Sequence, residues 1–404
     1  MILKITPIRE RMLIALFVRI FMLILIVVLA KRLPAYGFIA NTPEYDDFRY
    51  EQGAVMYAER AKSIIDVGAF TKIYDSMGDW TGHHLARPLT EGFLWYWIVC
   101  TITYLTKWRW WIRILNIFLS VFITKYIYEL SEILFTKKVA ERASLIYAIF
   151  PYTVIFSCFS YKDTLVSFCL FFIISFFAKA KHGEKVTKGQ KLKLIIVCLL
   201  FIFVRSGVSE ILIGLCLLYY YFEIRKTITV KKLLVIIVLL AAGMVMAFLT
   251  VDLILYKFNA YIGETSIEEL SGGALVKITG IRDIWKLPFN FGFSILQPIR
   301  YSGSIESWAS LVSRLNILMC PIAIAAIMEI VFHRRKDKYL SISILVFYLI
   351  CSVSSVLVFR QLYSVWPIPL MYACNYLTNS RLDKKAFVGG TSAILAVAVI
   401  IVLR

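Results

Sequence analysis

The first apolar run of the chain, residues 12–31, reads MLIALFVRIFMLILIVVLAK. About 20 residues of helix match the thickness of the hydrocarbon core of a bilayer. Basic residues precede the run, as in a secretory signal peptide, but the KRLP sequence at 31–34 offers no small-residue cleavage site. We therefore expect the run to be a retained membrane-spanning helix.

Comparable runs recur along the chain, which has 404 residues, 60% of them hydrophobic and 18% charged. With a mean hydropathy of +0.76, a soluble domain would expose a very large apolar surface. The composition predicts an all-α polytopic membrane protein that forms a single unit over residues 1–404. We expect about eleven spans, at residues 12–31, 111–132, 140–158, 164–178, 192–205, 207–222, 233–252, 309–331, 340–358, 362–377 and 387–403.

The net charge of +19 comes from short basic clusters between these runs, at residues 137–142, 179–193, 225–232, 334–338 and 381–385. Such clusters mark cytoplasmic loops. We therefore expect a protein of the plasma membrane with its N-terminus in the cytoplasm. Because the charge follows no helix face or tail, nucleic acid is not an expected partner. The eight cysteines lie in apolar stretches without metal-ligand spacing, which argues against disulfides and a zinc site.

The apolar segment at residues 89–106 would reverse this sidedness if it crossed the membrane. Its aromatic residues, such as Trp95, instead suit a helix lying at headgroup level in the outer interface. An ordinary span is the alternative. The interfacial interpretation leaves two long outer loops, at residues 32–110 and 254–308, so function is expected on the outer face.

Two positions in these outer segments carry carboxylates. Asp46 and Asp47 follow the first span, and Asp163 follows Lys162 in a turn between two later spans. These acids could serve as a general base or as ligands of a divalent cation. Helix capping, for example of a helix at residues 47–66, and a local ion pair are the structural alternatives.

Histidines and ionisable residues in the spans extend the candidate site. His83 and His84 could bind a divalent cation together with Asp46 and Asp163. Arginine suits phosphate because its planar fork donates two hydrogen bonds at once, and arginines near the outer ends of spans or in outer loops can also simply snorkel to the interface. The candidate cations are Arg205, Arg300 and Arg360. Glu210 is a carboxylate a few residues into a span, and Arg205 is its expected partner.

Short motifs occur in a characteristic order along the chain: DDFRY at 46–50, RPL at 87–89, RILN at 113–116, the segment from Phe150-Pro151 to Asp163, FVRSG at 203–207, and Arg360-Gln361-Leu362 followed by Pro367. This order resembles the GT-C membrane glycosyltransferases, which include protein O-mannosyltransferases, the bacterial aminoarabinose transferase and oligosaccharyltransferase. The resemblance covers roughly residues 1–220 well and the rest loosely. We expect only about eleven spans and no soluble C-terminal domain, which sets the chain apart from the lipid-monosaccharide enzymes of the class.

The resemblance implies transfer of a sugar from a polyprenyl-phosphate-linked donor, held among membrane lipids, to a glycan, lipid or protein acceptor. Asp46 matches the catalytic carboxylate, with Asp47 as the fallback, and Asp163 helps to build the site or to orient a cation. Arg205 or Arg360 would stabilise the departing lipid phosphate. The other residues expected to bind substrate or phosphate are Arg300, Glu210, Lys162 and Arg87.

Three other functions remain open. A Wzy- or EpsG-like polysaccharide polymerase would use Arg282 and Arg300 of the loop at 254–308 and would tolerate loss of Asp46. A lipid-linked sugar flippase or transporter would need charged residues near the bilayer midplane, for which Glu210 is the clear candidate. A non-catalytic membrane scaffold is the third possibility.

Overall fold

In the computed structural model, every element within the described residues is a helix. The structure describes residues 6–39, 46–77, 93–184, 186–204, 307–315, 318–332, 363–381 and 384–393. Within these ranges the chain forms α-helices and one short 3-10 helix, η1. The predicted all-α class is confirmed at this level.

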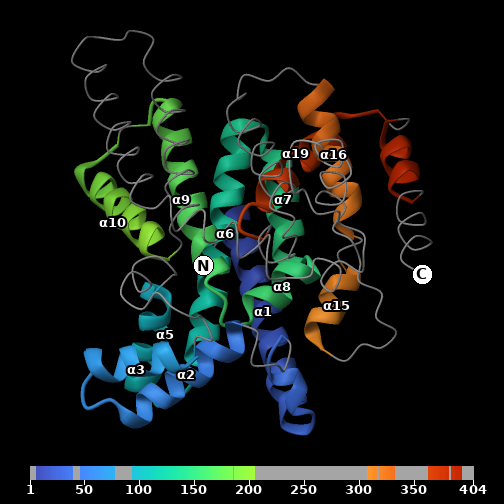
Figure 1. The fold of residues 1–404 in the computed structure, drawn as a ribbon. Coiled ribbons are helices and arrows are strands. Elements are labelled where there is room, and N and C mark those ends of the chain that lie inside the picture. Colours follow the sequence, from blue (N-terminus) through green and yellow to red (C-terminus); the bar gives the residue numbers. More distant parts are fainter. Residues whose placement is uncertain are drawn as a thin grey trace, which may run out of the picture.

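The core of the structure is a bundle around α6 (Figure 1). This helix packs against α1, α7 and α9. The bounds of the four helices are Pro7–Arg32 for α1, Trp111–Leu134 for α6, Lys137–Ile149 for α7 and Asp163–Lys181 for α9. The outward faces of α1 are strongly apolar, with Phe17 73% exposed, as a lipid-facing helix requires.

Helices α1, α6 and α9 are long and apolar enough to cross a membrane. They coincide with the predicted spans at 12–31, 111–132 and 164–178. The predicted span at 140–158 is a bent pair, α7 and α8 (Pro151–Ser157), with an angle of 55° between them. The chain bends there because Pro151 has no N–H for the helical ladder and its ring crowds the preceding turn. Whether the pair forms the predicted span stays a prediction.

The remaining predicted spans are covered only in part. Helix α10 (Lys188–Val204) matches the span at 192–205, and two helices, α15 (Trp308–Leu315) and α16 (Met319–Phe332), fall on 309–331. Helix α19 (Pro367–Asn379) begins five residues later than predicted, since a proline suits the first helical position. Residues 384–393 are also helical. The spans at 207–222, 233–252 and 340–358 lie outside the described residues, so the number of spans stays a prediction.

One end of the bundle, called the site end here, is where α1 ends and α6 begins. There η1 (Pro34–Gly37), α2 (Asp46–Arg60), α3 (Val67–Met77) and α5 (Phe93–Thr106) gather, at the bottom of Figure 1. Helix α5 packs on α2, with further contacts to α6 and α10. Its Trp95 is fully buried within the protein. The depth of the segment at 89–106 in the membrane stays a prediction.

Candidate functional site

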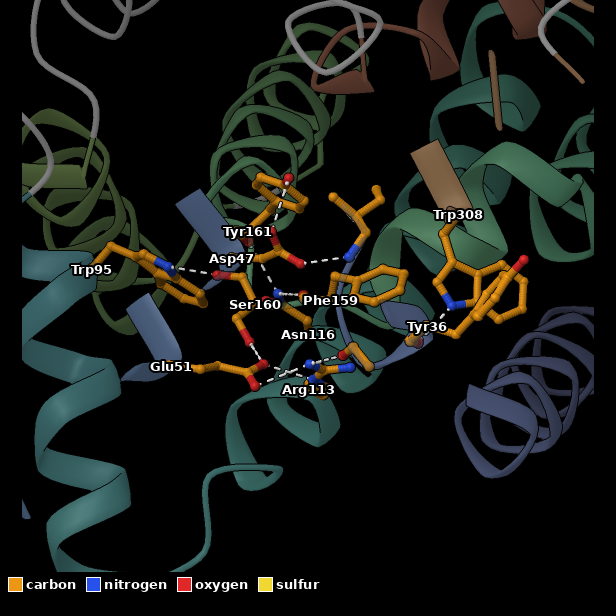
Figure 2. A network of polar contacts seen from close by, with 12 residues as sticks. Tyr36, Asp47, Glu51, Trp95, Arg113, Asn116, Phe159, Ser160, Tyr161 and Trp308 are labelled. Atoms are coloured by element: carbon orange, nitrogen blue, oxygen red, sulfur yellow. Dashed lines mark hydrogen bonds and ion pairs between the residues drawn. The ribbon is translucent and has the colours of Figure 1, made fainter. Parts of the chain in front are cut away.

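A buried polar network joins α2, α6 and the turn between α8 and α9 at the site end (Figure 2). Its charged members are Asp47 and Glu51 from α2 and Arg113 from α6, all at most 1% exposed. Charged groups are seldom buried this completely unless they are paired and hydrogen-bonded. The partners of each group therefore define what the site can do.

The Asp47 carboxylate connects the segment after η1 with the turn that precedes α9. Its Oδ2 accepts a hydrogen bond from the Ile39 backbone N–H at 2.8 Å, and its Oδ1 accepts one from the Tyr161 hydroxyl at 3.3 Å. Burial raises the pKa of Asp47 from 3.8 to about 7, although the Ile39 N–H and the charge of Arg113 act in the opposite direction. The charge of this carboxyl can therefore change near neutral pH.

Glu51 and Arg113 form a two-point ion pair beside Asp47. Arg113 Nε donates to Glu51 Oε1 at 2.6 Å, and Nη2 donates to Glu51 Oε2 at 3.0 Å and to the Gly37 carbonyl at 2.7 Å. Ser160 Oγ also donates to Glu51. Glu51 lies one helical turn after Asp47, so both carboxylates face α6 from the same side of α2. The pair neutralises itself and fixes α2 against α6.

The turn between α8 and α9 is held through its carbonyl groups. Asn116 Nδ2 donates to the carbonyls of Phe159 and Tyr161 at 2.6 and 3.0 Å, and Trp95 Nε1 donates to the carbonyl of Ser160 at 3.0 Å. Turn carbonyls have no helical partner, and burial without one would be costly. Side chains from α5 and α6 supply these partners, which sets the position of Tyr161 on Asp47.

The structure brings the two predicted acidic regions together. Asp47 contacts the turn before α9, and Asp163, fully buried, is the first residue of α9 directly after that turn. Lys162, the residue before Asp163, is only partly buried. Asp46 is the first residue of α2, and its side chain lies outside the described part.

The other predicted site residues lie outside the described residues: Arg87, Arg205, Glu210, Arg300 and Arg360, with His83, His84 and Arg282. Their placement stays a prediction. Within the described ranges, no group of three or more His, Cys, Asp or Glu side chains is arranged to hold a metal ion.

Several members of the network were not among the predicted site residues: Glu51, Trp95, Arg113, Asn116, Ser160 and Tyr161. Some carried a readable signal. Glu51 stands four residues after Asp47, and Arg113 and Asn116 stand three apart in an apolar helix, so each pair shares a helix face. Trp95 and Ser160 carried no readable sequence signal, because their contact depends on how α5 packs against the turn between α8 and α9.

This arrangement offers a proton acceptor in a buried, hydrogen-bonded setting. Asp47 has the pKa of a base that works at neutral pH, and Glu51 keeps the Arg113 charge from forming a tight pair with it. No family model, curated protein or solved structure matches this chain.

Proposed function

We propose that the chain is a membrane glycosyltransferase of the GT-C type, which transfers a sugar from a polyprenyl-phosphate-linked donor to a cell-envelope acceptor on the outer face. The observation that carries the proposal is the Asp47 carboxyl, buried with a pKa of about 7 where α2 meets the bundle. The helices α1, α6 and α9, long enough to cross a membrane, support the placement of this site at a lipid boundary.

The reaction needs a base and an anion clamp. The acceptor hydroxyl attacks the anomeric carbon, the bond from that carbon to the phosphate oxygen breaks, and the base takes the hydroxyl proton. We place the base in the Asp46-Asp47 pair and assign it to Asp47, the member of the pair whose side-chain contacts are described. Its 3.3 Å bond to Tyr161 is the weaker of its two hydrogen bonds, and the acceptor hydroxyl would take the place of the Tyr161 hydroxyl there.

The departing lipid phosphate needs a cation other than Arg113, which is committed to Glu51 and Gly37. We assign this role to Arg205 or Arg360, as the resemblance implies. Helix α10, which packs on α5 and α9, is described up to Val204, the residue before Arg205. Asp163 would orient the site from the start of α9.

Complementation of a missing surface glycan tests the assignment. Asp46→Asn, Asp47→Asn and Asp163→Asn are expressed in a strain that lacks the protein, and their amounts in the membrane are measured. Asp47→Asn is expected to be abundant but inactive, because an amide fills the same space without accepting a proton. Asp66→Asn is the matched control, since Asp66 is an acid of the same loop whose contacts are to its own turn.

Normal glycan from all three site variants would contradict the proposal. Attention would then pass to Arg282 and Arg300 of the loop at 254–308, as in a polymerase, or to transport. Loss of glycan with Asp46→Asn alone would keep the proposal and move the base to Asp46.

The rate of transfer is expected to rise with pH, about tenfold per unit below pH 7, and to level above it, since the base must be ionised. The free energy of unfolding should show the opposite trend and fall as pH rises. The folded protein binds the Asp47 proton more tightly than the unfolded chain, so the stability from this group is full below about pH 4 and is lost as pH rises through 7. Sugar incorporation in membrane vesicles and thermal unfolding at several pH values measure both trends. A flat rate profile, or an unfolding profile that Asp47→Asn leaves unchanged, would contradict this prediction.

A further inference from the structure

The turn between α2 and α3, residues 61–66, presents large apolar side chains on its outside. Ile64 is 40% exposed, Ile65 is 71% exposed and Val67, which starts α3, is 59% exposed. Exposed turns usually carry small or polar residues, so three exposed aliphatic side chains in four positions need an explanation.

Two side chains hold the backbone of this turn through hydrogen bonds. Tyr57 is buried beneath the turn, and Asp66 caps it. The Tyr57 hydroxyl, on a side chain only 1% exposed, donates to the Ile64 carbonyl at 2.9 Å and accepts from the Asp66 N–H at 3.0 Å. The Asp66 carboxylate accepts from the N–H groups of Lys62 at 3.0 Å and Ala69 at 2.9 Å, and these bonds lower the pKa of Asp66. The exposure of Ile64 and Ile65 is therefore built into the fold.

The end of α5 adds to this surface. The Tyr57 ring contacts the Tyr104 ring, with centroids 6.1 Å apart, and Lys107 Nζ donates to the Ala58 carbonyl at 3.1 Å. These contacts bring the end of α5 to the end of α2. Beyond them, Leu105 is 60% and Trp108 is 45% exposed. We call Ile64, Ile65, Val67, Leu105 and Trp108 the apolar rim.

Basic side chains flank the apolar rim. The exposed basic side chains are those of Arg60, Lys62, Lys72 and Lys107. The acids described nearby are Glu59, which is exposed, and Asp66, whose carboxylate caps its own turn. Aliphatic and tryptophan side chains beside lysine and arginine are typical of protein surfaces that enter the headgroup region, where the bases meet lipid phosphates. Two copies of the chain meeting at this surface would instead bring like charges together.

We propose that the apolar rim inserts into the headgroup and acyl boundary of the lipid leaflet at the site end. The partner is the lipid surface itself. Because α2 carries Tyr57 near one end and Asp47 near the other, this anchor would hold the candidate site at a fixed depth relative to that leaflet. The inference does not depend on the proposed glycosyl transfer.

Photo-crosslinking in the full-length protein tests the proposal. The photoreactive residue p-benzoylphenylalanine replaces Ile65, or Glu59 as an exposed charged control on α2. Each protein is reconstituted in vesicles of phosphatidylethanolamine and phosphatidylglycerol and irradiated, and adducts are identified by mass spectrometry. We expect phospholipid adducts at position 65 at least several-fold above those at position 59. Adducts between two chains, or equal lipid labelling at both positions, would overturn the proposal.

A second variant separates insertion from simple proximity to the membrane. With the probe at position 65, Ile64→Ser and Val67→Ser together should lower the lipid adducts several-fold, because the remaining rim is too polar to enter the boundary. Both side chains are exposed, so thermal stability in detergent should stay close to that of the parent protein. Undiminished adducts in a stable variant would exclude insertion through the rim.

Discussion

Replacement of Glu51 by alanine is expected to lower the free energy of unfolding by about 3–5 kcal/mol. The change leaves the Arg113 guanidinium, which is fully buried, without its carboxylate partner, and it removes the acceptor of Ser160. A buried charge without a counter-charge is among the most destabilising changes in a core. Thermal or chemical unfolding of the purified protein in detergent or vesicles measures the loss.

Two companion variants make this prediction specific. Glu51→Leu combined with Arg113→Met should regain much of the lost stability, since an apolar pair of similar size can replace a buried ion pair. Glu10→Ala removes an exposed carboxylate from its 3.1 Å pair with Arg11 and should cost less than about 1 kcal/mol. A double variant as unstable as the sum of its single changes would mean that the charges are not coupled.

The sequence predicted the parts of this molecule that depend on local composition. Helices α1, α6 and α9 follow from long apolar runs, and their predicted bounds lie within a few residues of the observed ones. The bend at Pro151 was readable from the proline itself but was missed, because the apolar run continues across it. Span counting alone favours one helix there.

The candidate site was predicted less completely, for a physical reason. The motif assigned the catalytic role to Asp46 with Asp47 as the fallback, and only the fold shows that Asp47 is hydrogen-bonded to Ile39 and Tyr161. The contact of Trp95 with Ser160 spans 65 positions and has no local pattern. Motif order pointed to this region, whereas burial and long-range hydrogen bonds distinguish the residues within it.

Arg19, in the middle of the first apolar run, is a buried charged residue that stabilises the fold, as Glu51 and Arg113 do. Its side chain is fully buried, and it donates from Nε to Ser120 Oγ at 2.9 Å and from Nη1 to the Ala148 carbonyl at 2.8 Å. Nη2 lies 3.4 Å from the Tyr147 carbonyl. These two carbonyls end α7, where Pro151 offers no N–H and the chain bends into α8. Arg19 therefore supplies a donor to the Ala148 carbonyl, which the bend leaves without a helical partner. It shares the Tyr147 carbonyl with the Thr153 hydroxyl, which donates to it at 2.7 Å.

Arg19→Leu is expected to lower the free energy of unfolding by about 1–3 kcal/mol, because the buried Ala148 carbonyl loses its donor, whereas the Tyr147 carbonyl keeps the Thr153 hydroxyl. It should also impair the candidate site, since α8 leads into the turn that carries Ser160 and Tyr161. Ile20→Leu, a neighbouring change at a 43% exposed position, should alter stability by less than about 0.5 kcal/mol. Unfolding of the purified variants measures both.

A comparison of Arg19→Leu in the parent protein and in a Pro151→Ala variant tests this explanation. An alanine restores an N–H that can bond to the Tyr147 carbonyl and lets the helix continue, so that the next N–H can bond to the Ala148 carbonyl. Arg19→Leu should then be less destabilising in the Pro151→Ala protein than in the parent, by about 1 kcal/mol or more. If the loss is the same in both backgrounds, Arg19 stabilises the bundle through Ser120 and packing, and the bend does not depend on it.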